Sequence, residues 1–456
     1  MSVRRLAALA FTVLLPMADP TPAQQADALP DRLDGFVRTY VEMGVFSGAV
    51  LVAKGGEVVL EKGYGMASYS LEVPATPTHR FRVASISKAF TDVAVLRLVE
   101  AGALDWEDPV SRYVPDFPRG DDITVRMLAT NSSGLAHIND LPWYDQFEFR
   151  EWSLEEIVGR LAGEPLAFEP GTDSDYSNGG FALLALVLER ATGEIYGEVL
   201  REQVFEPAGM SDSGHEGHAR IVPRLAMGYT YGMDGIQPAP YVEMSLKTGG
   251  GSAYSTVGDL YRFARAIEDG RLIGAATADS LFGTIDSPTG HARVYHGGRA
   301  PGYTAALVRY PEPDVVIVVL SNNYSRLNEE ISDGLAGILF GGNYDNRLGE
   351  ILSRTPFPAV ALEAGQVAAI TGAWRHAWGI TFDLQEEDGT LVYRDPERGI
   401  RHPLIALSPT SFVSPWQWAR LEFDSADGKV LTGTMTWLDF PEKAWPLERR
   451  EREPSP

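Results

Sequence analysis

The sequence predicts an α+β fold in which an antiparallel sheet is flanked by helices and carries an all-helical lobe. A C-terminal all-β domain, either a small barrel or a sandwich, is expected to follow. Helical patterns fill residues 123–209 and lie between two groups of strand-like runs, which indicates a helical insertion into a sheet domain. The last ninety or so residues instead alternate in strand fashion between turn residues. We therefore expect a signal peptide over 1–23, a mixed domain over 29–350, a linker over 351–365 and a β-domain over 366–450.

Length and composition bound the class of protein. The chain has 456 residues, 44% of them hydrophobic, which is typical of a globular protein with two or three cores. Its formal net charge of −23 argues against nucleic acid and against an anionic membrane surface as partners. Because the sequence has no cysteine, disulfides, cysteine nucleophiles and thiolate metal sites are excluded.

The first residues are typical of an export signal. A basic start is followed by an apolar run over residues 6–15 and by small residues at Thr21 and Ala23. A run of this length is too short for a stable membrane anchor, and no later run reaches transmembrane length. A buried N-terminal helix is the alternative, but three prolines follow the run at once. We expect export to the periplasm or the exterior, with no stable membrane span.

The elements of the mixed domain follow from local patterns. The sequence predicts helices over 29–43, from Ser85 to about Gly102, and over 124–130, 153 onward, 180–192, 196–205, 255–269 and 326–340. Strands are expected over 47–53, 57–64, 292–296, 305–310 and 315–321, the first two joined by a hairpin at Lys54-Gly55-Gly56. Pro109, Pro115 and the following Pro118 indicate a loop over 103–117. Six of the nine tryptophans lie in the expected β-domain, where we expect them to fill a core.

Ser85 and Lys88 stand three residues apart at the start of an apolar helix, so their hydroxyl and ammonium groups would share one face. A serine hydroxyl needs a partner to take its proton, and a lysine whose pKa is lowered by burial can serve. Unpaired N–H groups at the helix start would suit an oxyanion beside Ser85. A helix that begins with serine and carries a surface lysine is the plainer alternative, and this pair alone does not exclude it.

Tyr176-Ser177-Asn178 lies in a loop at the start of another expected helix. A tyrosine near cations can have a lowered pKa and act as a base for the serine hydroxyl. Asn178 could hold a carbonyl or amide group of a substrate. Taken alone, the segment is explained equally well by a helix cap and a packed tyrosine.

His296-Gly297-Gly298 is expected to end the first of the late strands. Paired glycines there would let a substrate backbone approach closely, and the N–H of Arg299 would be a second oxyanion donor. An ordinary histidine at a strand end is the alternative reading of this segment alone.

Together and in this order, the three motifs resemble the serine β-lactamase and penicillin-binding-protein superfamily. The likeness is closest to the class C β-lactamase-like branch, which includes D-alanyl-D-alanine carboxypeptidases, D-aminopeptidases and esterases. It covers roughly residues 33–340 and extends to segments at 104–110, 131–135, 168–171 and 301–303. The resemblance implies a β-lactamase/transpeptidase-like fold and a serine hydrolase that forms an acyl-enzyme.

The resemblance also implies roles for individual residues. Those implied are Ser85 as nucleophile, Lys88 and Tyr176 for proton transfer, Asn178, His296, Gly297 and Gly298 for substrate binding, and the N–H groups of Ser85 and Arg299 for the oxyanion. It implies a small-molecule or short-peptide substrate and no metal or other cofactor. His215-Glu216-Gly217-His218 lacks the spacing of a zinc-binding helix and is interpreted as loop. The oligomeric state stays open.

His296 departs from the Lys-Thr-Gly that β-lactamases of this branch usually carry. Because histidine is only partly charged near neutrality, it favours a peptidase, aminopeptidase or esterase, and predicts a rate that varies around pH 6–7. The expected C-terminal β-domain favours the same members. A true β-lactamase and a non-catalytic penicillin- or cell-wall-binding sensor are the alternatives, although a sensor has no need of Ser85, Lys88 and Tyr176. The substrate, and hydrolysis as against transfer, stay open.

Overall fold

The structure is a computed structural model. It describes residues 28–450 except 43, 142, 145–149, 218–219, 233–234, 275–282, 326, 342–361, 363–365, 367, 377–380, 388–389, 396–399, 415–418, 427–428 and 438–443. The expected signal peptide and most of the expected linker lie outside the described residues. Within the described part of the chain, no helix is long and apolar enough to cross a membrane.

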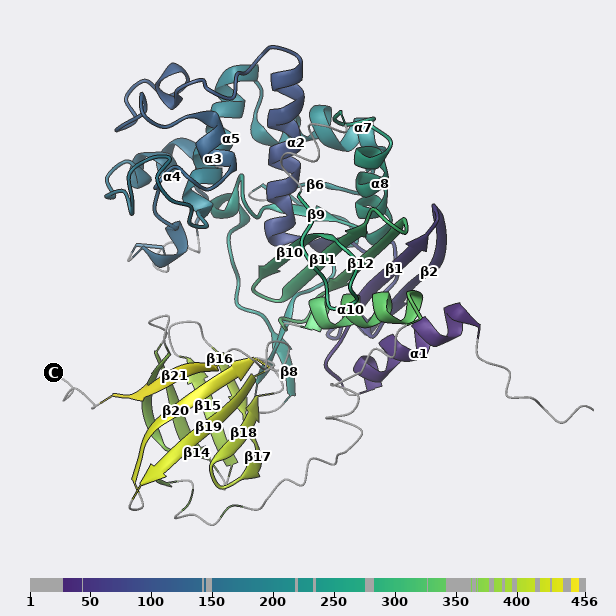
Figure 1. The fold of residues 1–456 in the computed structure, drawn as a ribbon, viewed down its shortest axis with the longest axis vertical. Helices are drawn as coiled ribbons and strands as arrows, with labels where there is room; N and C mark the ends of the chain where they lie inside the picture. Colours follow the sequence, from purple (N-terminus) through teal and green to yellow (C-terminus); the bar gives the residue numbers. More distant parts are fainter. Residues whose placement is uncertain are drawn as a thin grey trace, which may run out of the picture.

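A five-stranded antiparallel sheet forms the centre of the first domain (Figure 1). Its strands are β1 (Gly48–Lys54), β2 (Glu57–Tyr64), β10 (Val294–Ala300), β11 (Tyr303–Tyr310) and β12 (Val315–Ser321). They lie in the order β10-β11-β12-β1-β2, so the two ends of the domain sequence meet where β1 pairs with β12. The hairpin between β1 and β2 is confirmed, and Gly55 and Gly56 supply the positive φ values of 60° and 78° that its turn requires.

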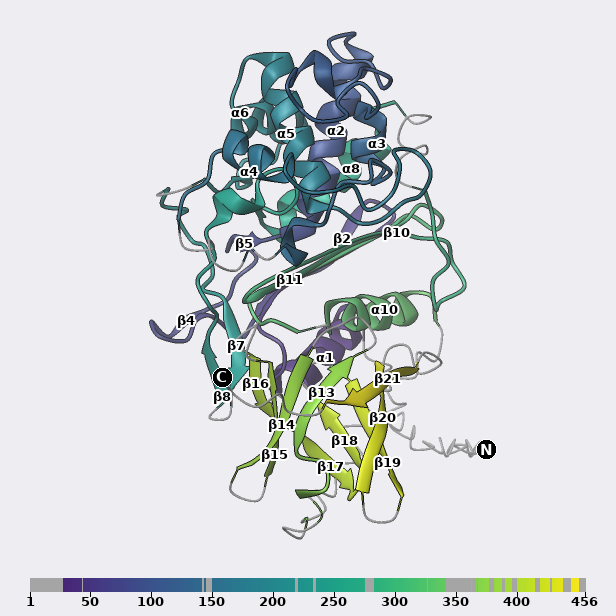
Figure 2. The same cartoon turned by 90° about the vertical axis from the view of Figure 1, so that its left-hand side faces the viewer.

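Helices cover both faces of this sheet (Figure 2). One face packs against α1 (Leu29–Glu42) and α10 (Leu327–Leu339), and its buried side chains include Val50, Val52 and Ile317. The other face packs against α8 (Val257–Glu268), and its side chains, such as Leu51 and Val318, share one core with the helical lobe. Neighbouring residues of a strand point to opposite faces, and both faces of this sheet are covered. β12 is therefore buried along its whole length, and residues 315–320 form a continuous apolar run.

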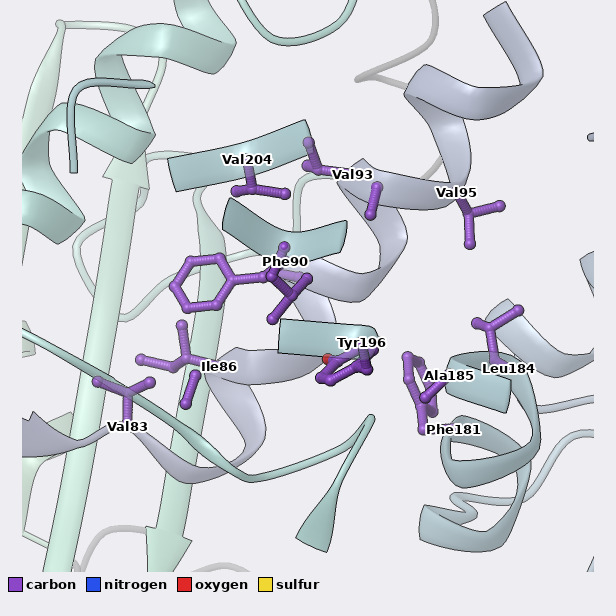
Figure 3. Packing of buried hydrophobic residues seen from close by; sticks show 14 of the residues in the cluster. Val83, Ile86, Phe90, Val93, Val95, Phe181, Leu184, Ala185, Tyr196 and Val204 are labelled. Atoms are coloured by element: carbon purple, nitrogen blue, oxygen red, sulfur yellow. The ribbon is translucent and has the colours of Figure 1, made fainter. Parts of the chain in front are cut away.

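The helical lobe lies over that second face. It comprises α2 (Ser87–Glu100), α3 (Val125–Ala129), α4 (Leu154–Leu161), α5 (Asn178–Thr192), α6 (Tyr196–Leu200), a π-helical turn η5 (Arg201–Phe205) and α7 (Glu206–Ala208). Ser153 and Glu156 form the predicted capping box at the start of α4, and Gly193 ends α5 with a φ of 77°. Phe90 of α2 packs edge-on against Phe205 and Phe263 in the core shown in Figure 3.

Short segments connect the sheet to the lobe. The strands β5 (Phe81–Arg82), β9 (Ala253–Ser255) and β6 (Gly214–His215) form a small sheet. Of these, β5 comes just before the 3-10 turn η1 (Ala84–Ile86) in the chain. Other short elements are β3 (Met66–Ser68), β4 (Val73–Pro74), β7 (Tyr229–Gly232), β8 (Gly235–Pro238), η2 (Val110–Arg112), η3 (Ile138–Asp140) and η6 (Met244–Lys247). The expected loop over 103–117 thus holds only one helical turn.

The C-terminal domain is a single nine-stranded antiparallel sheet that curls into a nearly closed barrel (Figure 2). Its strands are β13 (Gly372–His376), β14 (Thr381–Glu387), β15 (Thr390–Asp395), β16 (Ile400–Pro403), β17 (Ile405–Ser408), β18 (Ser411–Ser414), β19 (Ala419–Ala426), β20 (Lys429–Trp437) and β21 (Ala444–Arg449). Trp374 is buried in its separate core, and Trp445 packs against that core. The barrel is thus the observed form of the predicted β-domain, while the exact domain boundaries stay a prediction.

One boundary differs in a way that matters for function. His296-Gly297-Gly298 was expected to end a strand, but β10 continues through it to Ala300. The strand continues because each of these residues pairs with β11, His296 opposite Leu307 and Gly298 opposite Ala305. Such pairing across the chain overrides the local turn preference of two glycines. As β10 is an edge strand of the sheet, its other edge is not paired with a further strand of this sheet in the described part of the chain.

Candidate active site

A cleft of about 490 Å³ lies between the helical lobe and the edge strand β10. The turn η1 and helix α2 supply Ser85, Lys88, Ala89 and Asp92 to its wall, and the end of α3 and the residues after it supply Ala129, Thr130 and Asn131. The remaining lining residues are Tyr176, Phe181, Gly283, Val294, Tyr295, His296 and Gly297. The three predicted motifs therefore meet at one cleft.

Ser85 is held on a tight turn between β5 and α2. Its neighbour Ile86 is buried in the lobe core, which anchors the turn (Figure 3). Ala84 has a φ of 47°, a left-handed conformation that turns the chain sharply just before the serine. The Ser85 Oγ lies 2.6 Å from the Tyr176 hydroxyl, a hydrogen bond in which either oxygen could donate. The serine hydroxyl is thus presented to the cleft with a potential proton acceptor in contact.

The Lys88 ammonium group is buried and fully engaged. Its Nζ lies 2.6 Å from Asn178 Oδ1, 2.9 Å from the Gly250 carbonyl oxygen and 3.5 Å from Ser85 Oγ. Burial lowers the pKa of Lys88 to about 7; the charge of Lys247 lowers it further, and Asp92 opposes the shift. A substantial fraction of Lys88 is therefore neutral near pH 7 and able to accept a proton.

Tyr176 differs from the expectation. We expected nearby cations to lower its pKa, but loss of hydration around the hydroxyl raises it, with the Ser85 hydrogen bond and Arg299 opposing the rise. Although 45% of the residue surface is exposed, the hydroxyl faces Ser85 inside the cleft. The tyrosine is thus protonated at neutral pH, and it is better suited to relay a proton than to hold a negative charge.

Asn178 is the first residue of α5, where Ser177 caps the helix by accepting from the Gly180 N–H at 2.9 Å. Its side-chain amide has partners at both ends. The Oδ1 accepts from Lys88, and the Nδ2 donates to Asn139 Oδ1 at 2.6 Å. Asn178 therefore fixes the position of the lysine, in addition to any contact with substrate.

The edge strand β10 passes directly beside the nucleophile turn. A Cβ added at Gly298 would lie 2.1 Å from the Val83 carbonyl oxygen and 3.1 Å from the Ser85 nitrogen. Only glycine allows this approach. The backbone of Gly298 and Arg299 is thereby brought beside the Ser85 N–H, which supports the predicted pair of oxyanion donors.

His296 does not titrate in the expected range. Burial lowers its pKa to about 4, and the charge of Arg309 lowers it further. The imidazole is consequently neutral at pH 6–7, so the predicted rate dependence on His296 in that range is wrong. His296 lines the cleft as a neutral polar group.

The segment at 215–218 is structural where it is described. His215 Nδ1 lies 2.8 Å from Ser252 Oγ, and Glu216 forms a bidentate ion pair with Arg82. His218 lies outside the described residues. The described part of the chain contains no group of three histidine or acidic side chains arranged to hold a metal ion.

Gly250 is a site residue that was not predicted from the sequence. Its carbonyl accepts from Lys88, and an added Cβ would lie 2.9 Å from Lys88 Nζ and 3.1 Å from Asn178 Oδ1. The signal in the sequence was the run of three glycines at 249–251, whose meaning depends on a lysine 162 residues away. Asn139 was also missed as an individual residue.

Gly250→Ala is expected to lower kcat/KM about 100-fold, because it displaces the lysine amine from Ser85. Steady-state kinetics with an ester substrate measure this. Gly251→Ala is the matched control, since its nearest atom, Lys247 Cβ, lies at an ordinary 3.5 Å. Equal losses in both variants would show that the loop, not the lysine contact, is what matters.

This chain is similar to known proteins in sequence and in fold. The chain matches the β-lactamase family over residues 33–339. Penicillin-binding protein 4* of Bacillus subtilis (strain 168) is 31% identical over 353 residues, covering 69% of this chain and 76% of that protein. The D-amino acid amidase from Ochrobactrum anthropi SV3, complexed with L-phenylalanine, is 25% identical with a TM-score of 0.60, covering 69% of this chain and 98% of that one.

A third likeness concerns the fold alone. The octameric penicillin-binding protein homologue from Pyrococcus abyssi is 22% identical with a TM-score of 0.60. It covers 92% of this chain and 99% of that chain, so the similarity extends into the C-terminal β-domain.

Proposed function

Because the chain belongs to the β-lactamase family and is a serine hydrolase of that family, we propose that it cleaves amides or esters of D-amino acids through an acyl-enzyme on Ser85. The observation that carries the proposal is the contact of Ser85 Oγ with Tyr176 at 2.6 Å and with Lys88 at 3.5 Å, inside a cleft. The likeness to the D-amino acid amidase supports this substrate class.

Acylation follows from the arrangement. Ser85 Oγ attacks the carbonyl carbon, and its proton passes to the neutral Lys88 amine, directly or through the Tyr176 hydroxyl. The oxyanion accepts hydrogen bonds from the N–H groups of Ser85 and Arg299. As the intermediate collapses, the amine or alcohol leaving group takes the proton back. Water then repeats the sequence on the acyl-enzyme and releases the acid.

Tyr176 and Lys88 differ in their distance from Ser85 and in their pKa, and these differences indicate different roles in proton transfer. Tyr176 is nearer to Ser85, but its raised pKa keeps its own proton in place. Lys88 is farther from the serine, but its pKa of about 7 makes it the better acceptor. We assign Lys88 as the base and Tyr176 as the relay.

The third motif bears on the substrate. With His296 neutral, this position offers no fixed cation for the carboxylate of a β-lactam, which makes a true β-lactamase the less supported alternative. Arg299 is exposed on β10, and its charge acts on Tyr176. The guanidinium of Arg299 is a cation that pairs well with a free carboxylate. Because a D-alanyl-D-alanine carboxypeptidase must bind such a carboxylate, this activity is the second candidate.

A substrate panel separates these activities. We expect p-nitrophenyl esters and D-aminoacyl anilides to be cleaved faster than D-Ala-D-Ala peptides and a chromogenic cephalosporin. A cephalosporin rate equal to that of the best ester would instead favour the β-lactamase. Stable labelling of Ser85 by penicillin with no turnover of any compound would favour the sensor.

Export is a further part of the proposal, and it rests on the basic and apolar pattern of residues 1–23 together with the likeness to a penicillin-binding protein. N-terminal sequencing of the protein recovered outside the cytoplasm would test it, and a retained Met1 would contradict cleavage.

The pH dependence of acylation should follow Lys88. We expect kcat/KM to rise with pH through an apparent pKa of about 7, because only the neutral amine accepts the serine proton. A pH profile with an ester substrate measures this. In His296→Gln the position of this limb should be unchanged, since the histidine is neutral throughout the range. A limb that disappears in that variant would assign the titration to His296.

A further inference from the structure

A buried acid lies in the cleft and has no part in the proposed acylation. Asp92 is only 8% exposed and lines the cleft together with Ser85 and Lys88. Its Oδ1 is buried without a hydrogen-bond partner among the described residues. A buried carboxyl group in that condition destabilises the fold, so its presence at a ligand cleft calls for an explanation.

Lys88 does not satisfy this acid. The Lys88 amine has hydrogen-bond partners in Ser85 Oγ, Asn178 Oδ1 and the Gly250 carbonyl oxygen, and the Asp92 carboxyl group is not among them. Within the described chain, no ion pair joins Lys88 to Asp92, although the two groups influence each other's pKa. Asp92 Oδ1 thus has no donor among the described residues, and Asp92 lines the cleft in which a ligand would supply one.

The path from η1 into α2 sets how far that donor lies from the reacting carbon. Ser85 lies in the 3-10 turn η1, which leads directly into α2, and Asp92 lies in α2 seven residues later, about two turns on, so the two residues share one face. Rises of about 2.0 Å per residue in a 3-10 turn and about 1.5 Å in an α-helix place their Cα atoms roughly 10 Å apart. An α-ammonium group beside the scissile carbonyl is too near Ser85 to reach Asp92, whereas one at the end of a four-carbon stem is well placed.

Part of the cleft wall suits such a stem. Ala89, Ala129 and Val294 line the cleft and present apolar surface to it. Aliphatic methylenes against apolar walls, with a charged head at a polar end, are the usual way in which a lysine side chain is accommodated.

We propose that Asp92 is a specificity-determining residue that binds the terminal ammonium group of a lysine- or ornithine-like acyl residue of the substrate. This inference rests on the proposed function, since it takes the acyl residue to be bound at Ser85. Burial raises the pKa of Asp92, and a cation in contact opposes that rise and favours the ionised carboxylate. The neutral fraction of Lys88 limits repulsion of the incoming ammonium group.

The test compares the p-nitrophenyl esters of D-lysine and D-norleucine, which differ in the terminal ammonium group. For the wild-type protein we expect a higher kcat/KM with the lysine ester. In Asp92→Asn the ratio of the two values should fall about 10- to 100-fold, the usual range for a hydrogen bond to a charged group. Asp92→Leu should reverse the preference, and thermal unfolding of both variants establishes that they fold.

Asp175→Asn is the matched control. Asp175 is an exposed acid next to Tyr176 and does not line the cleft, so its loss should leave the ratio unchanged. Equal reactivity of the two esters with the wild-type protein would overturn the proposal. So would a fall of both values by one factor in Asp92→Asn, because Asp92 would then act only through Lys88.

A second readout separates this proposal from the proposed function. A fluorophosphonate should label Ser85, and D-lysine amide should slow that labelling more than D-norleucine amide. Labelling and ester turnover without any preference for lysine would overturn the role of Asp92 and leave the hydrolase intact. No labelling and no turnover would overturn both.

Discussion

Replacing Ser85 by alanine is expected to lower hydrolysis of the best ester by at least about 10,000-fold. The variant retains Lys88, Tyr176 and the oxyanion donors but has no oxygen to form the acyl-enzyme. Intact-mass measurement after incubation with a fluorophosphonate should show one adduct on the wild-type protein and none on Ser85→Ala. The methyl group fits the same turn, so the melting temperature should change little.

Ser132→Ala is the control for this experiment. It follows the cleft residues Thr130 and Asn131 in the chain, and its hydroxyl contacts the Thr130 hydroxyl at 3.0 Å. It should keep both the adduct and the activity. The same adduct on Ser85→Ala would show that another residue is the nucleophile and would refute the assignment of Ser85.

Replacing Lys88 by methionine should lower the rate of acylation about 100- to 10,000-fold, the usual contribution of a general base. Methionine has similar length and no amine, so the loss isolates proton transfer. It also leaves Asn178 Oδ1 and the Gly250 carbonyl without the donor they have now, and a modest loss of stability should accompany the kinetic effect. Single-turnover kinetics with an activated ester measure the acylation step by itself.

Lys247 provides a comparison for the Lys88 prediction, because burial lowers the pKa of Lys247 to about 7 as well. It lies in η6 and donates to the Tyr144 hydroxyl. Lys247→Met removes a charge that lowers the pKa of Lys88, so the acid limb should move to higher pH while the plateau rate is kept. Loss of the plateau in Lys247→Met, with retention in Lys88→Met, would assign the base to Lys247.

Elements set by local chemistry were predictable from the sequence. The glycine turn at 54–56, the capping box of Ser153 and Glu156, and the end of α5 at Gly193 each involve residues within four positions of one another. The extension of β10 to Ala300 was not predictable in the same way. It depends on pairing with β11, which a local reading of two glycines does not contain.

In the candidate site, too, features set by local chemistry were predictable and features set by distant segments were not. The spacing of Ser85 and Lys88 was informative because one helical turn brings both groups together. The pKa values of Tyr176 and His296 were predicted wrongly, because burial by distant segments shifts them and the sequence does not reveal that burial. Gly250 was missed because its function is to leave space for an amine from another element.

The left-handed turn at Ala84 places a limit on how stable this protein can become without loss of function. An alanine at a φ of 47° costs on the order of 1 kcal/mol relative to a relaxed backbone. The free energy of folding carries that cost in every molecule, whether or not substrate is present. Selection for thermal stability alone would favour relaxing the turn, and the serine would then leave the edge of β10. The residue before the nucleophile is thus a point at which stability and catalysis are in conflict.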